Sequence, residues 1–289
     1  MSAGESGGAP GRAPILIGTS SFSSADWVGP FYPEGTKPAA FLSLYAREFA
    51  TVEVDSTYYA VPAASTVAGW AAKTPAGFVL SAKFPRSIVH GGEEAKPDPA
   101  KVLDPEATRA DRDRFLEVMA GLGSRLGPLV LQFPFFARDA FPSRAFFLER
   151  LDAFLGGLPV TFRYGVEVRN RDWMGPELAE VCRRHRAAMV LVDQAWMPHG
   201  DEVMKRMDPV TTDFAYVRLL GDRKKIEAIT THWDKEVIDQ APRLERWVPV
   251  LEKFAERGVR TMVYVNNHYA GHAPATARRL QQMLRGASS

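Results

Sequence analysis

The feature that most constrains the fold is a regular alternation of short apolar segments with amphipathic ones. Strand-like segments fall at 15–20, 51–59, 77–85, 126–134, 164–169, 188–193, 214–221 and 260–267. Segments with apolar residues at helical spacing lie between them, at 38–49, 64–73, 105–122, 143–155, 176–185, 239–257 and 274–284. Strict alternation predicts a parallel sheet, and eight units predict a (β/α)8 barrel of the TIM type. The stretch 194–213 has no convincing apolar helix, so we expect the helix after strand six to be reduced or replaced by a loop.

Size and composition agree with one barrel domain. The 289 residues are close to the roughly 250 that such a barrel needs. Residues 1–14 are small, polar and rich in glycine and proline, so we expect a disordered tail before a single domain at 15–289. The lone Cys182 cannot form an intramolecular disulfide, and no apolar run approaches the roughly 18 residues of a membrane span, which favours a cytoplasmic protein without membrane contact. The net charge of +2 is too small to favour nucleic-acid binding, which stays possible.

Two acidic residues in the second strand-like segment demand partners. Successive side chains of a strand point to opposite faces, so Glu53, Asp55 and Thr57 share one face and the intervening valines share the other. In a barrel the valines would face the helices and the acids would face the interior. Because an unpaired buried charge is costly, we expect cations from other strands to meet these acids, with Lys83 on the next strand among them.

Polar residues gather at the carboxyl ends of the predicted strands, the end at which TIM barrels carry their active sites. The candidate catalytic residues there are Glu53, Lys83, Glu167 and Asp193. The candidate substrate-binding residues are Arg169, Arg218, Gln132, Asn266, Asn267, His90 and the rim aromatics Trp27, Tyr32, Tyr58 and Trp173. The opposite ends of the strands are plain by comparison, so we interpret the carboxyl end as a cleft for a polar or anionic ligand.

The same residues allow other interpretations. A structural ion network would also gather charges, and the rim aromatics would serve equally as hydrophobic plugs. Glu53 and Glu167 come from non-adjacent strands and match the paired carboxylates of glycosidases. Lys83 would suit a Schiff-base nucleophile or, more commonly, an ion-pair partner.

Metals and cofactors are not favoured. Histidines His90, His268 and His272 could ligate a metal beside the acids, but three cations at the same mouth would repel a divalent ion. The sequence shows no phosphate loop, dinucleotide fingerprint, nucleophile elbow or zinc-protease motif. We therefore expect no metal and no cofactor.

The strand ends also carry a family resemblance. The motifs are Gly18-Thr19-Ser20; Trp27 with Phe31-Tyr32-Pro33; Glu53 with Ser56-Thr57-Tyr58-Tyr59; Lys83, Pro85 and His90; Gln132 with Pro134; Glu167, Arg169 and Trp173; Asp193; Tyr216-Val217-Arg218 with Gly221; and Asn266-Asn267 with Gly271-His272-Ala273-Pro274. On these motifs, in order along nearly the whole chain, the sequence resembles the domain-of-unknown-function 72 family, the YecE-like proteins. The resemblance implies a TIM-like barrel and no established reaction.

The chain departs from that family pattern in three places. Ser21-Phe22 stand where Gly-Trp is expected, and Asp55 replaces what is commonly an asparagine. Leu220 stands where a histidine often follows the arginine of strand seven. The negative charge of Asp55 would shift the balance of the pocket toward acids.

These observations together favour an enzyme, a hydrolase or lyase, that acts on a polar and anionic small molecule. Lys83 and the strand-end arginines would hold the anionic or oxyanionic group. Glu53 or Glu167 would act as general base or nucleophile, and Asp193 would orient a group or share a proton. One alternative is a non-catalytic ligand-binding or scaffold barrel with a structural ion network. Another is a metal-dependent nucleic-acid-processing barrel, whose binding would weaken steeply as salt rises.

Overall fold

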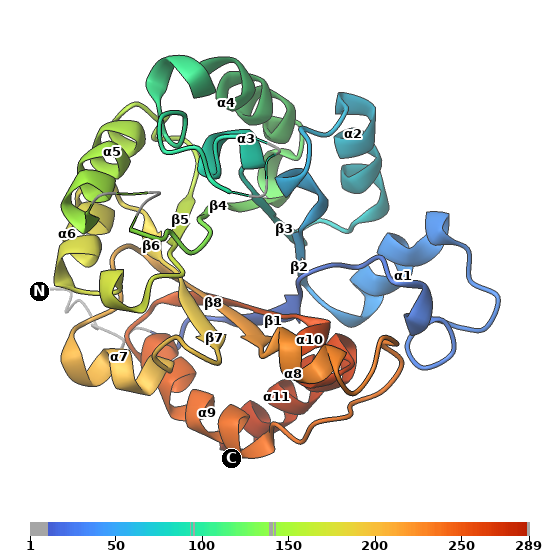
Figure 1. The fold of residues 1–289 in the computed structure, drawn as a ribbon. Helices are drawn as coiled ribbons and strands as arrows, with labels where there is room; N and C mark the ends of the chain where they lie inside the picture. Colours follow the sequence, from blue (N-terminus) through green and yellow to red (C-terminus); the bar gives the residue numbers. More distant parts are fainter. Residues whose placement is uncertain (1–10, 93, 95, 139–140, 142, 288–289) are drawn as a thin grey trace, which may run out of the picture.

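The computed structural model describes residues 11–92, 94, 96–138, 141 and 143–287. Parallel strands form an inner wall, and helices surround that wall on the outside (Figure 1). The strands are β1 Ile15–Thr19, β2 Thr51–Val54, β3 Val79–Lys83, β4 Leu126–Gln132, β5 Tyr164–Glu167, β6 Ala188–Met189, β7 Leu191–Gln194, β8 Phe214–Gly221 and β9 Arg260–Val265. The TIM-type α/β barrel predicted from the sequence is confirmed.

The strands pair into two parallel sheets, in the orders β1-β9-β8-β7 and β2-β3-β4-β5-β6. The sixth predicted strand supplies both β6 and β7, because the chain passes from one sheet to the other at Val190. The Val190 amide still donates to Val166 of β5, over 2.9 Å. One barrel is therefore built from two half-sheets.

The helices follow the strands in the predicted order. They are α1 Phe41–Glu48, α2 Ala64–Lys73, α3 Arg86–Val89, α4 Pro105–Ala120, α5 Arg144–Gly156, α6 Pro176–Arg184, α7 Gly200–Arg206, α8 Arg223–Glu227, α9 Ala241–Glu256, α10 Asn267–Ala270 and α11 Ala273–Ala287. Short 3-10 turns lie at Ala25–Trp27, Pro38–Ala40, Ser56–Tyr58, Gly123–Arg125 and Arg171–Trp173. Helix α7, which follows the sixth strand position, has only seven residues, so the expected reduction at this position is confirmed.

Because successive side chains of each strand point to opposite faces, the buried apolar residues form two clusters, one inside the barrel and one between the strands and the helices. The inner cluster consists of Val130, Ala188, Val190, Val192, Phe214, Tyr216, Leu220, Met262 and Tyr264. The outer cluster, between the strands and the helices, includes Val52 and Val54, so the valines of β2 face the helices as predicted. On β8, every second residue from Phe214 to Leu220 points inward, which places Arg218 on the inner face.

A tyrosine hydroxyl joins the two half-sheets where β1 meets β2. Tyr45 of α1 is completely buried; its hydroxyl accepts from the Thr19 amide over 2.8 Å and donates to the Thr51 carbonyl over 3.1 Å. The strands approach closely here because Gly18 has no side chain. A Cβ at Gly18 would lie 2.1 Å from the Thr51 carbonyl oxygen, which is inside any van der Waals contact.

Two local predictions need correction. Strand β2 ends at Val54 instead of continuing to residue 59, because Ser56–Tyr58 forms a 3-10 turn. Thr57 therefore does not share the strand face of Glu53; its hydroxyl donates to the Lys83 carbonyl over 2.9 Å. At the amino end, residues 1–10 of the expected tail lie outside the described residues, but Ala13 contacts the barrel through a 2.9 Å hydrogen bond to Ala255.

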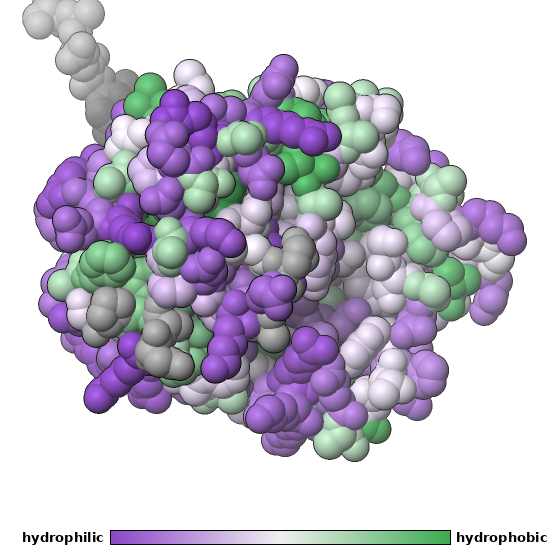
Figure 2. Space-filling view, turned by 45° about the horizontal axis from the view of Figure 1, so that its top comes forward, coloured by the Kyte–Doolittle hydropathy of each residue, from purple (hydrophilic) through white to green (hydrophobic). Residues whose placement is uncertain are grey.

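The surface view in Figure 2 shows hydrophilic side chains over most of the face that it presents, with hydrophobic residues in smaller patches between them. Within the described part of the chain, no helix combines the length and apolar character needed to cross a bilayer.

Candidate functional site

Arg218 forms the centre of the barrel mouth. It stands near the carboxyl end of β8 and is 2% exposed. Its guanidinium donates to Glu53 Oε1 from Nη2 over 2.8 Å, and from Nη1 to Glu167 Oε2 over 2.6 Å and Gln132 Oε1 over 2.7 Å. Three strands of the opposite half-sheet thus converge on one arginine. Arg218 is one of the cations from other strands that were expected to meet the acid of β2.

Glu53 is fully buried and fully paired. Besides Arg218, it accepts a 2.7 Å hydrogen bond from the Tyr216 hydroxyl, and Lys83 Nζ lies 3.6 Å from Oε1. Burial alone would raise the pKa of the Glu53 carboxyl, but Arg218 and Lys83 outweigh it and lower that pKa to about 2. A carboxylate held this firmly in the ionised form is a poor general acid or base at neutral pH.

Glu167 is held in the same way. Its carboxylate contacts Arg218 on one side and Arg169 Nε, at 2.5 Å, on the other. Burial opposes ionisation of Glu167, and the two arginines prevail and lower its pKa. Arg169 continues the network to Gln194 Oε1 over 2.8 Å. Glu53 and Glu167 do face each other across the mouth, but Arg218 lies between them, which does not suit a glycosidase-type pair.

The buried carboxylates predict a loss of stability in acid. The pKa of Glu53 is depressed, from 4.5 to about 2, so its contribution is complete above pH 4.5 and is lost as the pH falls toward 2. A shift of this size corresponds to roughly 3 kcal/mol at neutral pH. We expect the free energy of unfolding, measured by urea titration, to fall over this pH window. Glu53→Gln should flatten the slope, whereas the exposed Glu117→Gln should keep it; equal slopes in all three proteins would contradict the assignment.

Lys83 and Asp55 differ from the two glutamates in their electrostatics. The Lys83 side chain is 9% exposed at the end of β3. Burial and the neighbouring cation of Arg218 lower the pKa of Lys83, although Glu53 and Asp55 oppose the shift. Burial raises the pKa of the Asp55 carboxyl, against the effect of Lys83. Acid and base are therefore shifted toward the range in which side chains exchange protons at neutral pH.

A small cavity of about 230 Å³ opens beside Asp55. Its lining includes Ser20, Asp55, Trp233, Asn266, Asn267 and His268, from the carboxyl ends of β1, β2 and β9 and from the loop before α9. Asn266 Oδ1 accepts from the His268 amide over 2.9 Å, and Asn267 Oδ1 accepts from the Ala273 amide over 3.0 Å, so both amide groups are held in fixed orientations. The Ser20 hydroxyl is buried and has no hydrogen-bond partner among the described residues, which leaves it available to a ligand.

The structure does not bring Asp193 to this mouth. Its neighbour Val192 belongs to the inner cluster, so Asp193 points outward toward the helices. Its carboxylate accepts from Trp247 Nε1 of α9 over 2.7 Å and from the Tyr269 hydroxyl of α10 over 2.8 Å, and Arg243 Nε lies 2.5 Å away. The expectation that Asp193 orients a group or shares a proton in the cleft is therefore corrected: Asp193 anchors helices to β7.

Most of the predicted rim aromatics are packing residues. Tyr32 is 1% exposed and stacks on Phe41 with ring centroids 4.5 Å apart. Trp173 is 5% exposed and packs on Phe147 at 4.7 Å. Trp27 is 1% exposed, although its Nε1 donates to Asn267 over 3.3 Å at the edge of the small cavity.

Tyr58 and His90, the other two candidates, differ in how far they are buried. Tyr58 is half-buried, and Arg86, Arg169 and Glu167 are close enough to influence its pKa, which burial raises. His90 is 6% exposed at the end of α3, where its carbonyl accepts from the Asp98 amide over 2.9 Å. Tyr58 thus stays at the mouth, whereas His90 is part of the packed loop.

Sequence reasoning missed Tyr216, the hydroxyl that completes the shell of Glu53. The available signal was its position two residues before Arg218, on the same strand face. Among the described residues, no group of three or more His, Cys, Asp or Glu side chains is arranged to hold a metal ion.

Comparison with protein families yields one match over nearly the whole chain. Residues 16–289 match the model of a family described as "Protein of unknown function DUF72". The chain is 33% identical over 156 residues to the UPF0759 protein YecE of Escherichia coli K12. That match covers 54% of this chain and 48% of the relative, so the chain spans about half the length of the curated protein that it matches.

Solved structures support the same conclusion about the fold. A DUF72 family protein from Thermotoga maritima superposes with a TM-score of 0.70 at 27% identity, covering 94% of this chain and 99% of that one. A DUF72 family protein from Enterococcus faecalis has a TM-score of 0.67 at 22% identity, with 94% and 96% covered. D-psicose 3-epimerase, solved in the presence of D-fructose, has a TM-score of 0.51 at 12% identity, with 88% and 92% covered. The last two likenesses show the fold alone.

Proposed function

The chain belongs to the DUF72 family, whose description states no function, and from its own side chains we propose that the barrel mouth is the active site of a lyase that acts on a small anionic carbonyl compound through Lys83. The observation that carries the proposal is the position of Lys83, buried beside Arg218. A lysine next to a second cation in a desolvated site is the arrangement that makes an amine neutral and nucleophilic near pH 7.

The chemistry requires few groups. Nζ of neutral Lys83 adds to the carbonyl carbon, the Asp55 carboxyl supplies one proton, and water leaves, which gives the protonated imine and the Asp55 carboxylate. For a substrate with a hydroxyl on the β-carbon, the Asp55 carboxylate takes the proton of that hydroxyl and the bond between the α- and β-carbons breaks. The β-carbon leaves as the carbonyl carbon of an aldehyde, and the electron pair of the broken bond forms the enamine. Protonation of the resulting enamine by the same carboxyl, followed by hydrolysis of the imine, restores both groups. Asp55 suits this role because its carboxyl and the Lys83 amine influence each other electrostatically.

Charge and hydrogen bonding favour an anionic substrate. With Lys83 neutral and Asp55 protonated, Arg169 and Arg218 balance the ionised Glu53 and Glu167. The protonated imine on Lys83 then adds one positive charge to the mouth, which an anionic substrate would offset. The Ser20 hydroxyl and the fixed amides of the adjacent cavity supply donors and acceptors for the polar part of the molecule. Glu53 and Glu167 act in this proposal as fixed counterions that position Arg218.

Reductive trapping tests the role of Lys83. We expect glyoxylate with sodium cyanoborohydride at pH 7 to modify Lys83 in preference to exposed lysines, because an exposed amine is almost entirely protonated at this pH. Peptide mass spectrometry locates the modification. Lys83→Arg keeps a cation beside Glu53 but cannot form an imine, so it should abolish the preferred modification, whereas Lys73→Arg on the surface of α2 should not change it. Modification spread evenly over the surface lysines would refute the proposal.

A non-catalytic barrel is the second candidate, and the complete pairing of Glu53, Glu167 and Arg218 favours it. In that case the charges at the mouth would serve stability alone. The two candidates differ at Lys83, because a purely structural lysine would stay protonated against Glu53 and would not be trapped. Failure of the trapping experiment would therefore favour the structural network.

A further inference from the structure

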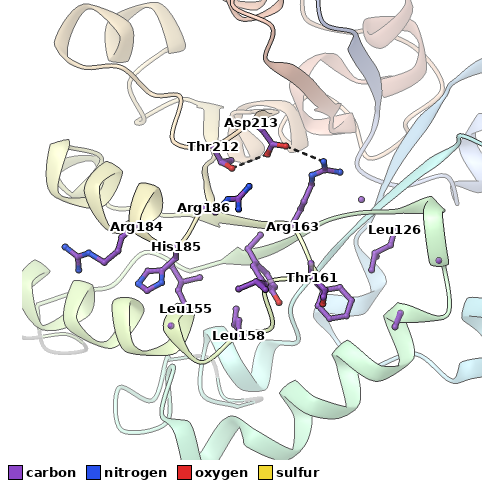
Figure 3. Close-up of a pocket in the computed structure, with 17 residues that line it drawn as sticks. Leu126, Leu155, Leu158, Thr161, Arg163, Arg184, His185, Arg186, Thr212 and Asp213 are labelled. Atoms are coloured by element: carbon purple, nitrogen blue, oxygen red, sulfur yellow. Dashed lines mark hydrogen bonds and ion pairs between the residues drawn. The ribbon is translucent and has the colours of Figure 1, made fainter.

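A second cavity, of about 740 Å³, lies on the face of the barrel opposite to the mouth (Figure 3). Its lining comes from the amino ends of the strands: Leu126 begins β4, Tyr164 begins β5, Arg186 lies just before β6 and Asp213 just before β8. The volume falls within the roughly 300–1,000 Å³ of ordinary small-molecule sites. The sequence predicted few polar or charged residues at this end of the strands.

The lining carries more positive than negative charge. Arg163, Arg184 and Arg186 stand in it against a single acid, Asp213. Arg184 pairs with Asp152 at 2.8 Å, and Arg163 lies 3.4 Å from Asp213 in a contact that is more than half exposed on both sides. Within the described part of the chain, no hydrogen bond or ion pair engages the Arg186 guanidinium. In the view of Figure 3, Arg186 lies between His185 and the pair formed by Arg163 and Asp213.

The backbone of Arg186 is in a conformation that rarely suits arginine. Its φ is +53°, in the left-handed region that favours glycine. Helix α9 ends with the same hydrogen bonds, and there the equivalent residue is Gly258, with φ +75°. In both cases this residue donates its amide to the carbonyl three residues before it, and the next amide donates to the carbonyl five residues before it. The chain therefore uses the favoured glycine at one helix end and a strained arginine at the other.

Because glycine forms the same helix end at Gly258, the left-handed strain at Arg186 is not needed to end helix α6. The strain therefore points to a role for the Arg186 side chain. Arg186 lines the cavity with an exposed side chain, and its five guanidinium donors meet no described residue. The remaining lining is partly apolar, with Leu155, Leu158 and Phe162 beside the arginines. A ligand that matches both parts has an anionic group and an apolar body.

We propose that this cavity binds a small organic phosphate or carboxylate, with its anionic group between Arg186 and Arg163 and its apolar body against the leucines. Guanidinium groups recognise both kinds of anion through paired hydrogen bonds. The long, exposed ion pair between Arg163 and Asp213 is replaced by an ion pair between Arg163 and the bound anion. The site is separate from the barrel mouth, and it does not depend on the chemistry proposed for Lys83.

Calorimetric titration of the full chain with 1-naphthyl phosphate tests this site. We expect one molecule to bind, and methyl phosphate to bind more weakly because it lacks the apolar body. Arg186→Gly should weaken binding of 1-naphthyl phosphate roughly tenfold to hundredfold, the usual effect of losing a charged hydrogen-bond donor. Arg163→Gln should weaken it in the same direction.

Thermal melting separates a binding role of Arg186 from a structural one. Arg186→Gly relieves the left-handed strain, so its melting temperature should equal or exceed that of the wild type. The matched control is Gly258→Arg, which adds the same strain at a position where a Cβ has open space, and should lower the melting temperature without changing affinity. No binding to the wild type, unchanged affinity in both arginine variants, or a fall in the melting temperature of Arg186→Gly would overturn the proposal.

Discussion

Replacing Arg218 by alanine is expected to lower the free energy of unfolding by about 3–5 kcal/mol, the usual cost of removing one partner from a buried ion network. Two carboxylates, Glu53 and Glu167, are both 0% exposed and would lose their principal counterion. Gln132 would lose its donor as well. Urea titration at pH 7 measures the change.

A matched surface variant separates this effect from the general loss of an arginine. Arg223 pairs with Glu227 on α8, but its side chain is 73% exposed, so Arg223→Ala should change stability by no more than about 0.5 kcal/mol. If Arg218→Ala proved as mild as Arg223→Ala, the network would not hold the barrel mouth.

Gly18→Ala is expected to be the second most damaging single change, with a loss of about 3 kcal/mol. The new Cβ would lie 2.1 Å from the carbonyl oxygen of Thr51 and 3.0 Å from the Tyr45 hydroxyl, so β1 and β2 would have to separate. The hydrogen bonds of Tyr45 to both strands would stretch with them. Chemical denaturation measures the loss, and near-ultraviolet circular dichroism should report the altered surroundings of Tyr45.

The control for this change is Gly69→Ala in helix α2. An added Cβ at Gly69 meets nothing within 4 Å, and alanine is the better helix former, so this variant should be neutral or more stable by up to about 1 kcal/mol. Equal stability of the two alanine variants would show that the contact between β1 and β2 adjusts freely.

Much of the fold was predictable because periodicity and turn signals act locally. The order of strands and helices follows from segments such as 214–221, whose predicted bounds coincide with β8. The alternation around Glu53 correctly placed the valines outward and the carboxylate inward. That alternation also required cationic partners, which Arg218 and Lys83 supply.

The remaining errors have a physical cause. The segment before Asp193 is apolar at every position, as is common in parallel strands buried on both faces, so nothing in it reveals which residues point inward. Whether Asp193 points inward or outward could not be deduced from the sequence, and the expectation that it points inward was wrong. The role of Tyr45 at the contact of β1 and β2, and the left-handed turn at Arg186, both depend on tertiary packing that no local pattern encodes.

The position of the ion network relative to the two half-sheets has a mechanical consequence. Arg218 and Tyr216 belong to the half that contains β8, whereas Glu53, Gln132 and Glu167 belong to the half that contains β2, β4 and β5. The network therefore joins the two half-sheets across the barrel mouth. A molecule that competes for Arg218 weakens this connection. Ligand binding at the mouth and separation of the two half-sheets are therefore expected to be thermodynamically coupled.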